Sequence, residues 1–393
     1  MKAYAKYGWE IIILGSNGPI ATISNGTPSS TPTPTTIPTS SVTSEVAATS
    51  AAPFSNSSAS SSGTSSGMVG EVVATPEENE SEYLEPVTVG GQVLNMDFDT
   101  GSADFWVFSS SLPASQSRGH STFDPSKSST WQPYSGGSWD ITYGDGTTAS
   151  GTVGYDVVNI GGATATRQAV EVATYVSSSF TQDTANDGLV GLAFSKINTV
   201  RPQAQQTFFD NVKGQLKLPI FTANLEDGAL GTYTFGEIDP TEYSGEIYYM
   251  AVDSSNGFWE FDSKTYTIGG SQRACTTCSP AIADTGTSLI LVDDDVATAY
   301  WSQVAGATLS SRMGGWVYPC SATLPTFGIA VGGYMAMLNG TDLEYSAVGG
   351  GKCFGGVQSN QGGGLQILGD VLLKNYFAVF DAGNERFGIA EKA

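Results

Sequence analysis

The chain has 393 residues, with 38 acidic against 16 basic, so its formal net charge is −22 and its isoelectric point lies near pH 4.1. Such a charge repels nucleic acid and anionic membranes. The sequence also contains no run of about 20 apolar residues, which is the length that a membrane-spanning helix needs. Short strand-like runs separated by Gly, Ser, Asn and Asp predict a mainly β protein, with short helices over 203–216 and 293–303. The acidic surface fits either adaptation to an acidic medium or simple solubility.

The N-terminal part of the chain does not have the composition of a folded domain. Residues 16–70 are dense in Ser, Thr, Pro, Ala and Gly, with few large apolar residues. Such a segment cannot bury enough surface to fold, so we expect a disordered linker that is open to O-glycosylation. Residues 1–20 contain no export signal, because the apolar run at 11–14 is shorter than the roughly 7–15 residues of a signal-peptide core.

The tripeptide Asp-Thr-Gly occurs twice, at residues 99–101 and 284–286, each time after an apolar run and before a hydroxyl residue. One copy alone is typical of a turn. Each copy, however, is followed downstream by an apolar-apolar-Gly segment, at 189–191 and 367–369, where Gly permits close passage behind the Asp loop. The repeat predicts two facing carboxyl groups. One is ionised to take a proton from water, and the other is protonated to polarise a carbonyl.

The other motifs predict a hairpin and give little support for a different catalytic mechanism. Residues 143–146, Tyr-Gly-Asp-Gly, lie between two strand-like runs, and Asp-Gly in that setting predicts a hairpin. The single histidine, His120, lies among Ser, Arg and Gly, which suggests a surface loop and gives a Ser-His-Asp triad little support. No metal constellation or phosphate-binding loop is present, so neither a metal nor a cofactor is expected.

The four cysteines favour disulfides. Cys275 and Cys278 form a C-x-x-C shortly before the second Asp-Thr-Gly. With no second C-x-x-C and one histidine, a redox or zinc role has less support than a short structural disulfide, although both readings remain open. Disulfides fit a secretory route, as do four N-glycosylation sequons, at Asn25, Asn56, Asn79 and Asn339.

Together these segments resemble the pepsin family of aspartic endopeptidases, and most closely its fungal secreted branch of aspergillopepsin and penicillopepsin type. The resemblance runs from about residue 75 to the C-terminus and rests on motifs in the family's order, at 98–107, 139–146, 187–194, 283–289 and 367–370. It implies an all-β, bilobal fold, with two β-barrel-like lobes related by a pseudo-twofold and an active site in the cleft between them. The expected N-terminal lobe is 71–242 and the expected C-terminal lobe is 243–393.

The resemblance implies that Asp99 and Asp284 are the catalytic pair of an endopeptidase, which hydrolyses peptide bonds through a water between the two carboxyl groups. The residues that follow each aspartate would support it. The backbone N–H groups of the glycines and the side chains of the hydroxyl residues would bond the carboxylates, and the threonines would bond across to the opposite loop, with ordinary turn capping as the alternative. These supporting residues are Thr100, Gly101, Ser102, Thr285, Gly286, Thr287 and Ser288.

The hairpin would then be a flap that closes over the substrate. Tyr143 would line the S1 pocket and pair with Trp106, and Gly144 would bond the peptide backbone; the alternative for Tyr143 is a core aromatic. Asp145 would let S1 accept Lys as well as large apolar residues, because a Lys stem packs along an apolar wall while its ammonium meets a carboxylate. Two further residues match apolar S1 positions or belong equally well to the lobe core: Phe180 and Leu189.

Cys320 and Cys353 match the single disulfide of the fungal branch, whereas the pair at 275 and 278 departs from it. Residues 1–15, which include Lys6, resemble the end of a propeptide. We therefore expect that the signal peptide and most of the prosegment are missing, through a start-site error or an unsecreted isoform. Lys6 would lie between the two carboxyl groups of a zymogen, unless it is simply a solvated residue of a disordered tail.

We expect a monomer that is secreted, with the vacuole as the other destination. It would act on proteins and peptides and bind pepstatin-like inhibitors, without nucleic-acid partners. The rival function is a pepsin-fold protein that binds peptide or protein without cleaving it. Relatives of that kind typically lose an aspartate or the flap tyrosine, whereas Asp99, Asp284 and Tyr143 are all present here.

Overall fold

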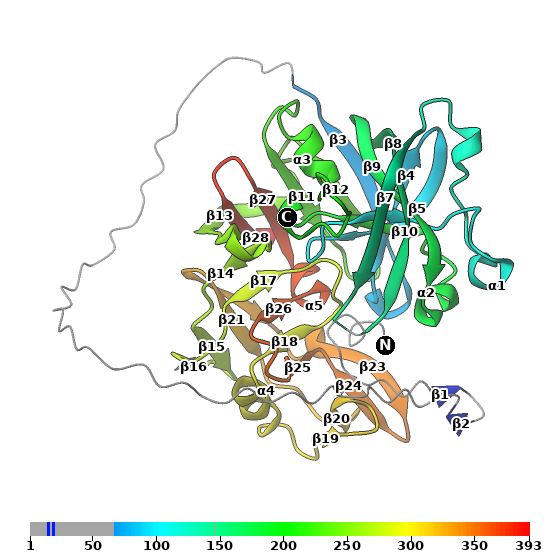
Figure 1. The fold of residues 1–393 in the computed structure, drawn as a ribbon. Helices are drawn as coiled ribbons and strands as arrows, with labels where there is room; N and C mark the ends of the chain where they lie inside the picture. Colours follow the sequence, from blue (N-terminus) through cyan, green and yellow to red (C-terminus); the bar gives the residue numbers. More distant parts are fainter. Residues whose placement is uncertain (1–13, 16–17, 20–66, 145) are drawn as a thin grey trace, which may run out of the picture. The chain divides into compact units, whose positions relative to one another are not determined.

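The structure, a computed structural model, describes residues 14–15, 18–19, 67–144 and 146–393 (Figure 1). Lys6, Asp145 and nearly all of the expected linker lie outside the described residues. Before residue 67, two short strands form an antiparallel pair, β1 (Leu14–Gly15) and β2 (Gly18–Pro19). From residue 67 onward strands dominate and helices are short, which confirms the predicted all-β class.

Six strands close into a barrel in the order β4-β5-β10-β6-β9-β8, because β8 also pairs with β4. In β5, alternation sets the inward face: Leu94, Met96 and Phe98 are at most 1% exposed, whereas Val93 is 61% exposed. Closure leaves these strands without a free edge and fixes the end of β5, where Asp99 lies. The six strands are β4 (Tyr83–Val89), β5 (Gln92–Asp99), β6 (Phe105–Val107), β8 (Thr148–Ile160), β9 (Ala163–Val176) and β10 (Gly188–Gly191).

The same sheet extends beyond the barrel and joins the two halves of the sequence. β27, from the C-terminal end of the chain, pairs with β11, from its middle. All residues of β27 are buried, as expected for a strand covered on both faces. The added strands are β3 (Gly70–Pro76), β7 (Gln132–Thr142), β11 (Ile220–Asn224), β12 (Gly231–Phe235), β13 (Tyr243–Ala251), β27 (Tyr376–Asp381) and β28 (Arg386–Lys392).

The second half of the chain contributes three smaller sheets. The first has the order β14-β17-β26-β18-β25, with β14 (Glu260–Phe261), β17 (Ala281–Ala283), β18 (Ile290–Val292), β25 (Val357–Ser359) and β26 (Gln366–Leu368). The second is β16 (Ser271–Ala274), β15 (Thr265–Ile268), β21 (Phe327–Val331) and β22 (Tyr334–Leu338). The third is β19 (Thr308–Ser310), β20 (Gly315–Pro319), β24 (Lys352–Gly355) and β23 (Glu344–Gly349).

The helices are short connectors. The helix expected over 203–216 is only α3 (Phe208–Val212), because the Thr207 side chain caps its first turn by accepting from Asp210 N–H. The other expected helix is α4 (Asp294–Trp301). The remaining α-helices are α1 (Ala114–Ser117), α2 (Ser178–Gln182) and α5 (Asp370–Leu373). Single 3₁₀ turns are η2 (Glu78–Glu80), η3 (Pro125–Lys127), η4 (Ser195–Ile197), η5 (Ser254–Asn256) and η6 (Thr341–Leu343).

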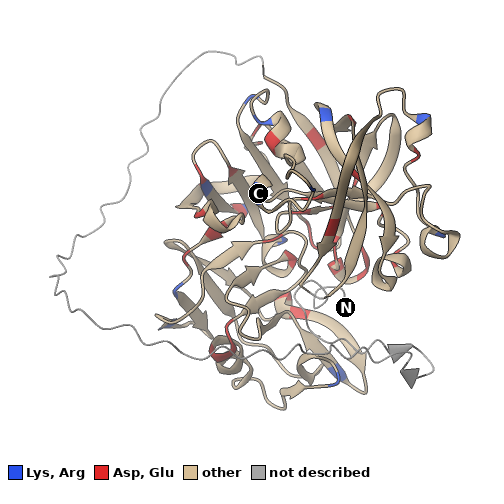
Figure 2. Cartoon of the chain, viewed as in Figure 1, with Lys and Arg blue, Asp and Glu red and all other residues tan. Residues whose placement is uncertain are grey.

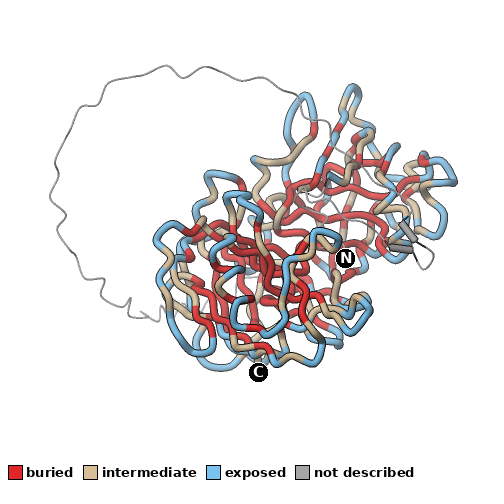
Figure 3. Tube along the Cα trace, turned by 90° about the horizontal axis from the view of Figure 1, so that it is seen from below, coloured by how far each residue is buried: buried red, intermediate tan, exposed pale blue. Residues whose placement is uncertain are grey.

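Buried residues follow the strands, and exposed residues follow the loops between them (Figure 3). One large apolar cluster includes residues from both halves of the chain, and a smaller one gathers around Trp106 and Trp139. Acidic side chains are scattered along the ribbon among fewer basic ones (Figure 2). Among the described residues, no helix has the length and apolarity needed to cross a bilayer.

Both expected disulfides form. Cys320–Cys353 connects the residue after β20 to β24, and Cys275–Cys278 closes a tight loop between β16 and β17. The disulfide reading of the C-x-x-C is therefore confirmed, and none of the four cysteines is free.

Removing the two disulfides should cost different amounts of stability. In the chain-entropy model a bridge contributes about 4 kcal/mol when its ends are 33 positions apart and about 2 kcal/mol when they are 3 apart. We therefore expect the double variant Cys320→Ser/Cys353→Ser to lose more free energy of unfolding than Cys275→Ser/Cys278→Ser. Urea unfolding of both variants at pH 4 measures this, and an equal or reversed order would contradict it.

Candidate active site

The two Asp-Thr-Gly loops lie at equivalent places in two sheets. Asp99 ends β5, which runs parallel to β10 with Gly191 opposite it. Asp284 follows β17, which runs parallel to β26. The apolar-apolar-Gly segments thus pass beside the aspartate strands, as predicted. Glycine is required where they do so: a Cβ on Gly369 would lie 2.0 Å from the Thr287 carbonyl oxygen.

The two loops face each other and are joined by reciprocal hydrogen bonds. Thr100 Oγ1 donates to the Ala283 carbonyl oxygen over 2.9 Å and accepts from Thr285 N–H over 3.0 Å. In return, Thr285 Oγ1 donates to the Phe98 carbonyl oxygen and accepts from Thr100 N–H over 3.2 Å. A Cβ added to Gly101 would lie 2.5 Å from Asp284 Oδ1, so the second carboxyl group lies directly against the first loop.

Each carboxyl group has the same two donors on its own loop. Asp99 accepts from Gly101 N–H on Oδ1 over 2.8 Å and from Ser102 Oγ on Oδ2 over 2.6 Å. Asp284 has the matching bonds, from Gly286 N–H over 3.1 Å and from the Thr287 hydroxyl over 2.6 Å. Both aspartates are buried. Such bonds favour the ionised form of a carboxyl group, whereas a second carboxyl group nearby disfavours it, which suits a pair that shares one proton.

The predicted hairpin is present. β7 and β8 pair from Trp139 opposite Gly151 to Thr142 opposite Thr148, and Tyr143 N–H donates to the Thr147 carbonyl oxygen over 2.9 Å across the turn. Gly144 belongs to this turn.

An aromatic cluster lies beside the turn of the hairpin. Trp106 Nε1 donates to the Tyr143 hydroxyl over 2.8 Å. The half-buried ring of Phe180 is edge-on to both, with centroids 5.0 Å from Trp106 and 5.7 Å from Tyr143. Leu189 belongs to the same cluster. The ring of Tyr143 is thus buried, and its hydroxyl is hydrogen bonded.

Elsewhere, Ser288 Oγ donates to the Ser81 carbonyl oxygen, another link between the two halves of the sequence.

His120 is in a loop, as expected, but its ring is half-buried. It stacks on Phe108 with centroids 3.7 Å apart, and Nδ1 bonds the Asn186 carbonyl oxygen over 2.8 Å. These contacts are structural and do not place it in a Ser-His-Asp arrangement.

Sequence reasoning missed a buried carboxyl pair beside the first loop. Asp104 and Glu171 are both fully buried and lie close enough together for the charge of Asp104 to act on Glu171. Burial raises the pKa of both groups, and the neighbouring Asp104 raises the pKa of Glu171 further. Thr199 donates to Asp104 through its N–H and hydroxyl, and Asn198 donates to Glu171 over 3.0 Å. The two residues are 67 positions apart in the sequence, so no local sequence pattern predicts that they lie together.

Glu85 is a third buried acid that the sequence analysis passed over. It is fully buried on β4, and burial raises its pKa well above the usual 4.5, with Asp97 and Asp370 adding to the effect. The backbone of Phe98, immediately before Asp99, offsets part of this rise in pKa. A signal was present, because Glu85 shares its strand parity with Tyr83, Val87 and Val89, which face inward.

Buried acids with raised pKa values make stability depend on pH. The folded protein holds protons that the unfolded chain gives up, so the stabilisation is complete below about pH 4 and is lost as pH rises through the raised values. Relative to the unsubstituted background, the free energy of unfolding of Glu85→Gln and of Glu171→Gln should therefore be more favourable at pH 7 than at pH 3.5, by at least about 1 kcal/mol. Urea unfolding in an Asp284→Asn background, which should prevent self-digestion, measures this. The exposed Glu78→Gln is the matched control, and equal pH profiles for all three would contradict the expectation.

Comparison with known proteins agrees with this geometry. The family model described as eukaryotic aspartyl protease matches residues 82–392. Aspergillopepsin-1 of Aspergillus clavatus is 51% identical over 326 residues, covering 82% of each chain. Aspergillopepsin-1 of Aspergillus fumigatus is 52% identical and penicillopepsin-2 of Penicillium janthinellum 50% identical, with the same coverage. The chain therefore belongs to the eukaryotic aspartyl protease family, a family of pepsin-type hydrolases.

Proposed function

We propose that this chain is an acid endopeptidase that hydrolyses peptide bonds with a water molecule activated between Asp99 and Asp284. One observation carries the proposal: two equivalent loops, tied together by reciprocal threonine bonds, present two carboxyl groups that each have the same donors. A single aspartate on a turn would not need a matched partner. No observation on the described residues favours the non-catalytic alternative.

The proposed reaction uses one shared proton. The ionised carboxyl group takes a proton from the water, whose oxygen attacks the carbonyl carbon of the scissile bond, while the protonated group gives its proton to the carbonyl oxygen. The C–N bond then breaks as a proton passes to the leaving amine, and the carbonyl re-forms. The carboxyl pair is left with one proton, as it began, and no covalent intermediate forms. The glycine N–H groups and the hydroxyl groups of Ser102 and Thr287 would keep both carboxyl groups oriented throughout.

The hairpin supplies the proposed specificity. Tyr143, Trp106, Phe180 and Leu189 form an apolar cluster at the turn of the proposed flap, which suits a pocket for a large apolar side chain at P1. Gly144 would bond the substrate backbone. Asp145, which lies outside the described residues, would extend acceptance to Lys.

Lobe limits and cellular setting complete the proposal. The lobes are 71–242 and 243–393, each carrying one aspartate loop. The enzyme is secreted, as suits its two disulfides, and acts as a monomer on proteins and peptides. Pepstatin-like compounds inhibit it by binding between the two carboxyl groups. Its net charge of −22 disfavours nucleic-acid partners.

The aspartate pair gives the most direct mutational test. Asp99→Asn and Asp284→Asn should each reduce kcat to below about 1% of wild type while the fold is kept, because an amide cannot hold or pass the shared proton. Peptide cleavage at pH 3.5 and circular dichroism measure the two effects. Asp295→Asn, an exposed aspartate on α4, is the control and should keep full activity. Activity retained in either pair variant would remove that aspartate from the mechanism.

Activity should follow the titration of the pair. We expect a maximum between about pH 2.5 and 5.5 and little activity near neutrality, since both the ionised and the protonated carboxyl group are needed. A kcat/KM profile on a stable peptide, with and without pepstatin, tests this. A maximum at pH 7 or above that pepstatin leaves unchanged would exclude the aspartic mechanism.

Asp145 should govern acceptance of Lys at P1. Asp145→Ser should lower kcat/KM for peptides with Lys at P1 by about tenfold or more and spare those with Phe or Leu, because only the ammonium loses a partner. Asp140→Ser on the same hairpin, whose side chain is 67% exposed, should change neither. Equal losses on both peptide classes in the Asp145 variant would assign Asp145 to hairpin structure.

A further inference from the structure

The two aspartate loops are supported unequally by the strands that lead into them. β5, which ends at Asp99, pairs with β4 at six successive positions, from Leu84 opposite Asp97 to Val89 opposite Gln92. β17, which leads into Asp284, has three residues, which pair with β14 at two positions and with β26 at three. Fewer backbone bonds therefore fix the entry to the second loop. The residues just before β17 add further hydrogen bonds that bear on its register.

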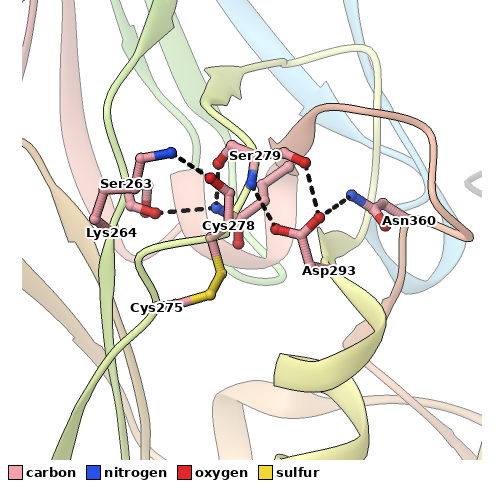
Figure 4. The surroundings of a disulfide bond; sticks show 8 residues. Ser263, Lys264, Cys275, Cys278, Ser279, Asp293 and Asn360 are labelled. Atoms are coloured by element: carbon pink, nitrogen blue, oxygen red, sulfur yellow. Dashed lines mark hydrogen bonds between the residues drawn. A yellow bond between two sulfur atoms is a disulfide. The ribbon is translucent and has the colours of Figure 1, made fainter. Parts of the chain in front are cut away.

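The disulfide Cys275–Cys278 lies just before β17, and the loop that it closes is hydrogen bonded to its surroundings at each end (Figure 4). Cys275 N–H donates to the Lys264 carbonyl oxygen over 2.8 Å, and Lys264 Nζ donates to the Cys278 carbonyl oxygen. Cys278 is 4% exposed. The covalent loop is thus anchored on Lys264, the residue before β15.

The next residue, Ser279, is held by Asp293. Its N–H donates to Asp293 Oδ2 and its hydroxyl to Oδ1, both over 2.8 Å. Asn360 Nδ2 also donates to Asp293 Oδ1, over 3.1 Å, and the three residues converge in Figure 4. Asp293 directly precedes α4, so Ser279 is fixed against the start of that helix.

Gln366 completes the attachment from the opposite strand. Its Nε2 donates to the Ser279 carbonyl oxygen over 2.8 Å and to the Ser263 carbonyl oxygen over 3.1 Å, and the residue is 1% exposed. Its N–H donates to the Pro280 carbonyl oxygen over 2.8 Å. Gln366 is also the first residue of β26, opposite Ala281. The bonds that satisfy Ser279 therefore also set the register of β17 on β26.

We propose that the Cys275–Cys278 disulfide is a positioning element for Asp284, acting through Ser279, Asp293 and Gln366. The disulfide limits the conformations of the loop, and this places Ser279 within hydrogen-bond distance of Asp293 and Gln366. The chain then passes from Ser279 into β17 in the register that brings Asp284 against Gly101. Because a displacement of about 1 Å at a reacting group can cost about a hundredfold in rate, a small shift of this entry would lower turnover. The proposal rests on the proposed catalytic role of Asp284.

Two features separate this role from a purely stabilising one. The bridge spans only 3 positions, so it restricts the unfolded chain less than Cys320–Cys353 does. It also lies six residues from Asp284, in direct continuity with β17. The zinc alternative loses its thiolate ligands while the bond is intact, because both sulfurs are consumed in it.

The test compares the two disulfides by turnover per active site. Cys275→Ser/Cys278→Ser and Cys320→Ser/Cys353→Ser are each titrated with a tight pepstatin-like inhibitor to count competent sites, and kcat and KM are measured at pH 4, well below Tm. We expect the first variant to lose at least about fivefold in kcat per titrated site, with KM within about twofold. The second should keep wild-type kcat despite its larger loss of stability. Unchanged kcat in the first variant, or equal losses in both, would overturn the proposal.

A second variant keeps the proposal testable if the first does not fold. Ser279→Ala leaves the disulfide in place and removes only the hydroxyl bond to Asp293, so kcat should fall in the same direction. Combined with Cys275→Ser/Cys278→Ser, its effect should be smaller than in the wild-type background, because the two act through one attachment. Ser279→Ala with unchanged kcat, or with fully additive effects, would contradict the proposal. An inactive wild-type enzyme would instead refute the proposed function.

Discussion

The four hydrogen bonds between Thr100 and Thr285 and the opposite loops are the constraint on which the site depends. Each threonine donates its hydroxyl to a carbonyl oxygen of the other loop and accepts that loop's threonine N–H. Separating the loops would leave buried polar groups unpaired, at about 1–3 kcal/mol each. The two loops are therefore held as one unit, although they lie 185 residues apart in sequence. This fixed approach lets a glycine backbone on one side contact a carboxyl group on the other.

Carboxyl groups are also buried close to one another away from the proposed reaction centre. Asp104 and Glu171 lie close together in the interior, and Glu85 is buried beside other acids. Each arrangement is favourable only when a proton is available, because burial penalises the charged form. A protein with a formal charge of −22 at pH 7 also repels itself less as its carboxylates protonate. The core, the surface and the proposed mechanism thus all favour acidic conditions.

The sequence predicted those features whose signals are local. A repeated Asp-Thr-Gly, an Asp-Gly between strand-like runs and a glycine after two apolar residues each report on a few neighbouring backbone positions. Features that depend on residues far apart in the sequence were not predicted. The Asp104–Glu171 pair depends on the pairing of β6 with β9, and the half-burial of His120 depends on the Phe108 ring beneath it. The helix expected at 203–216 was too long, because periodicity does not register the cap at Thr207. Lys6 and Asp145, outside the described residues, stay predictions.

The central claim is that Asp99 and Asp284 act on one atom between them, and a crystal structure with a statine-containing inhibitor tests it most directly. The account predicts that the statine hydroxyl, which takes the place of the attacking water, lies within hydrogen-bond distance of both carboxyl groups, at about 2.6–3.2 Å. It also predicts that the inhibitor's P1 side chain contacts Tyr143. An inhibitor bound elsewhere, or a hydroxyl that reaches only one of the two carboxyl groups, would contradict the account.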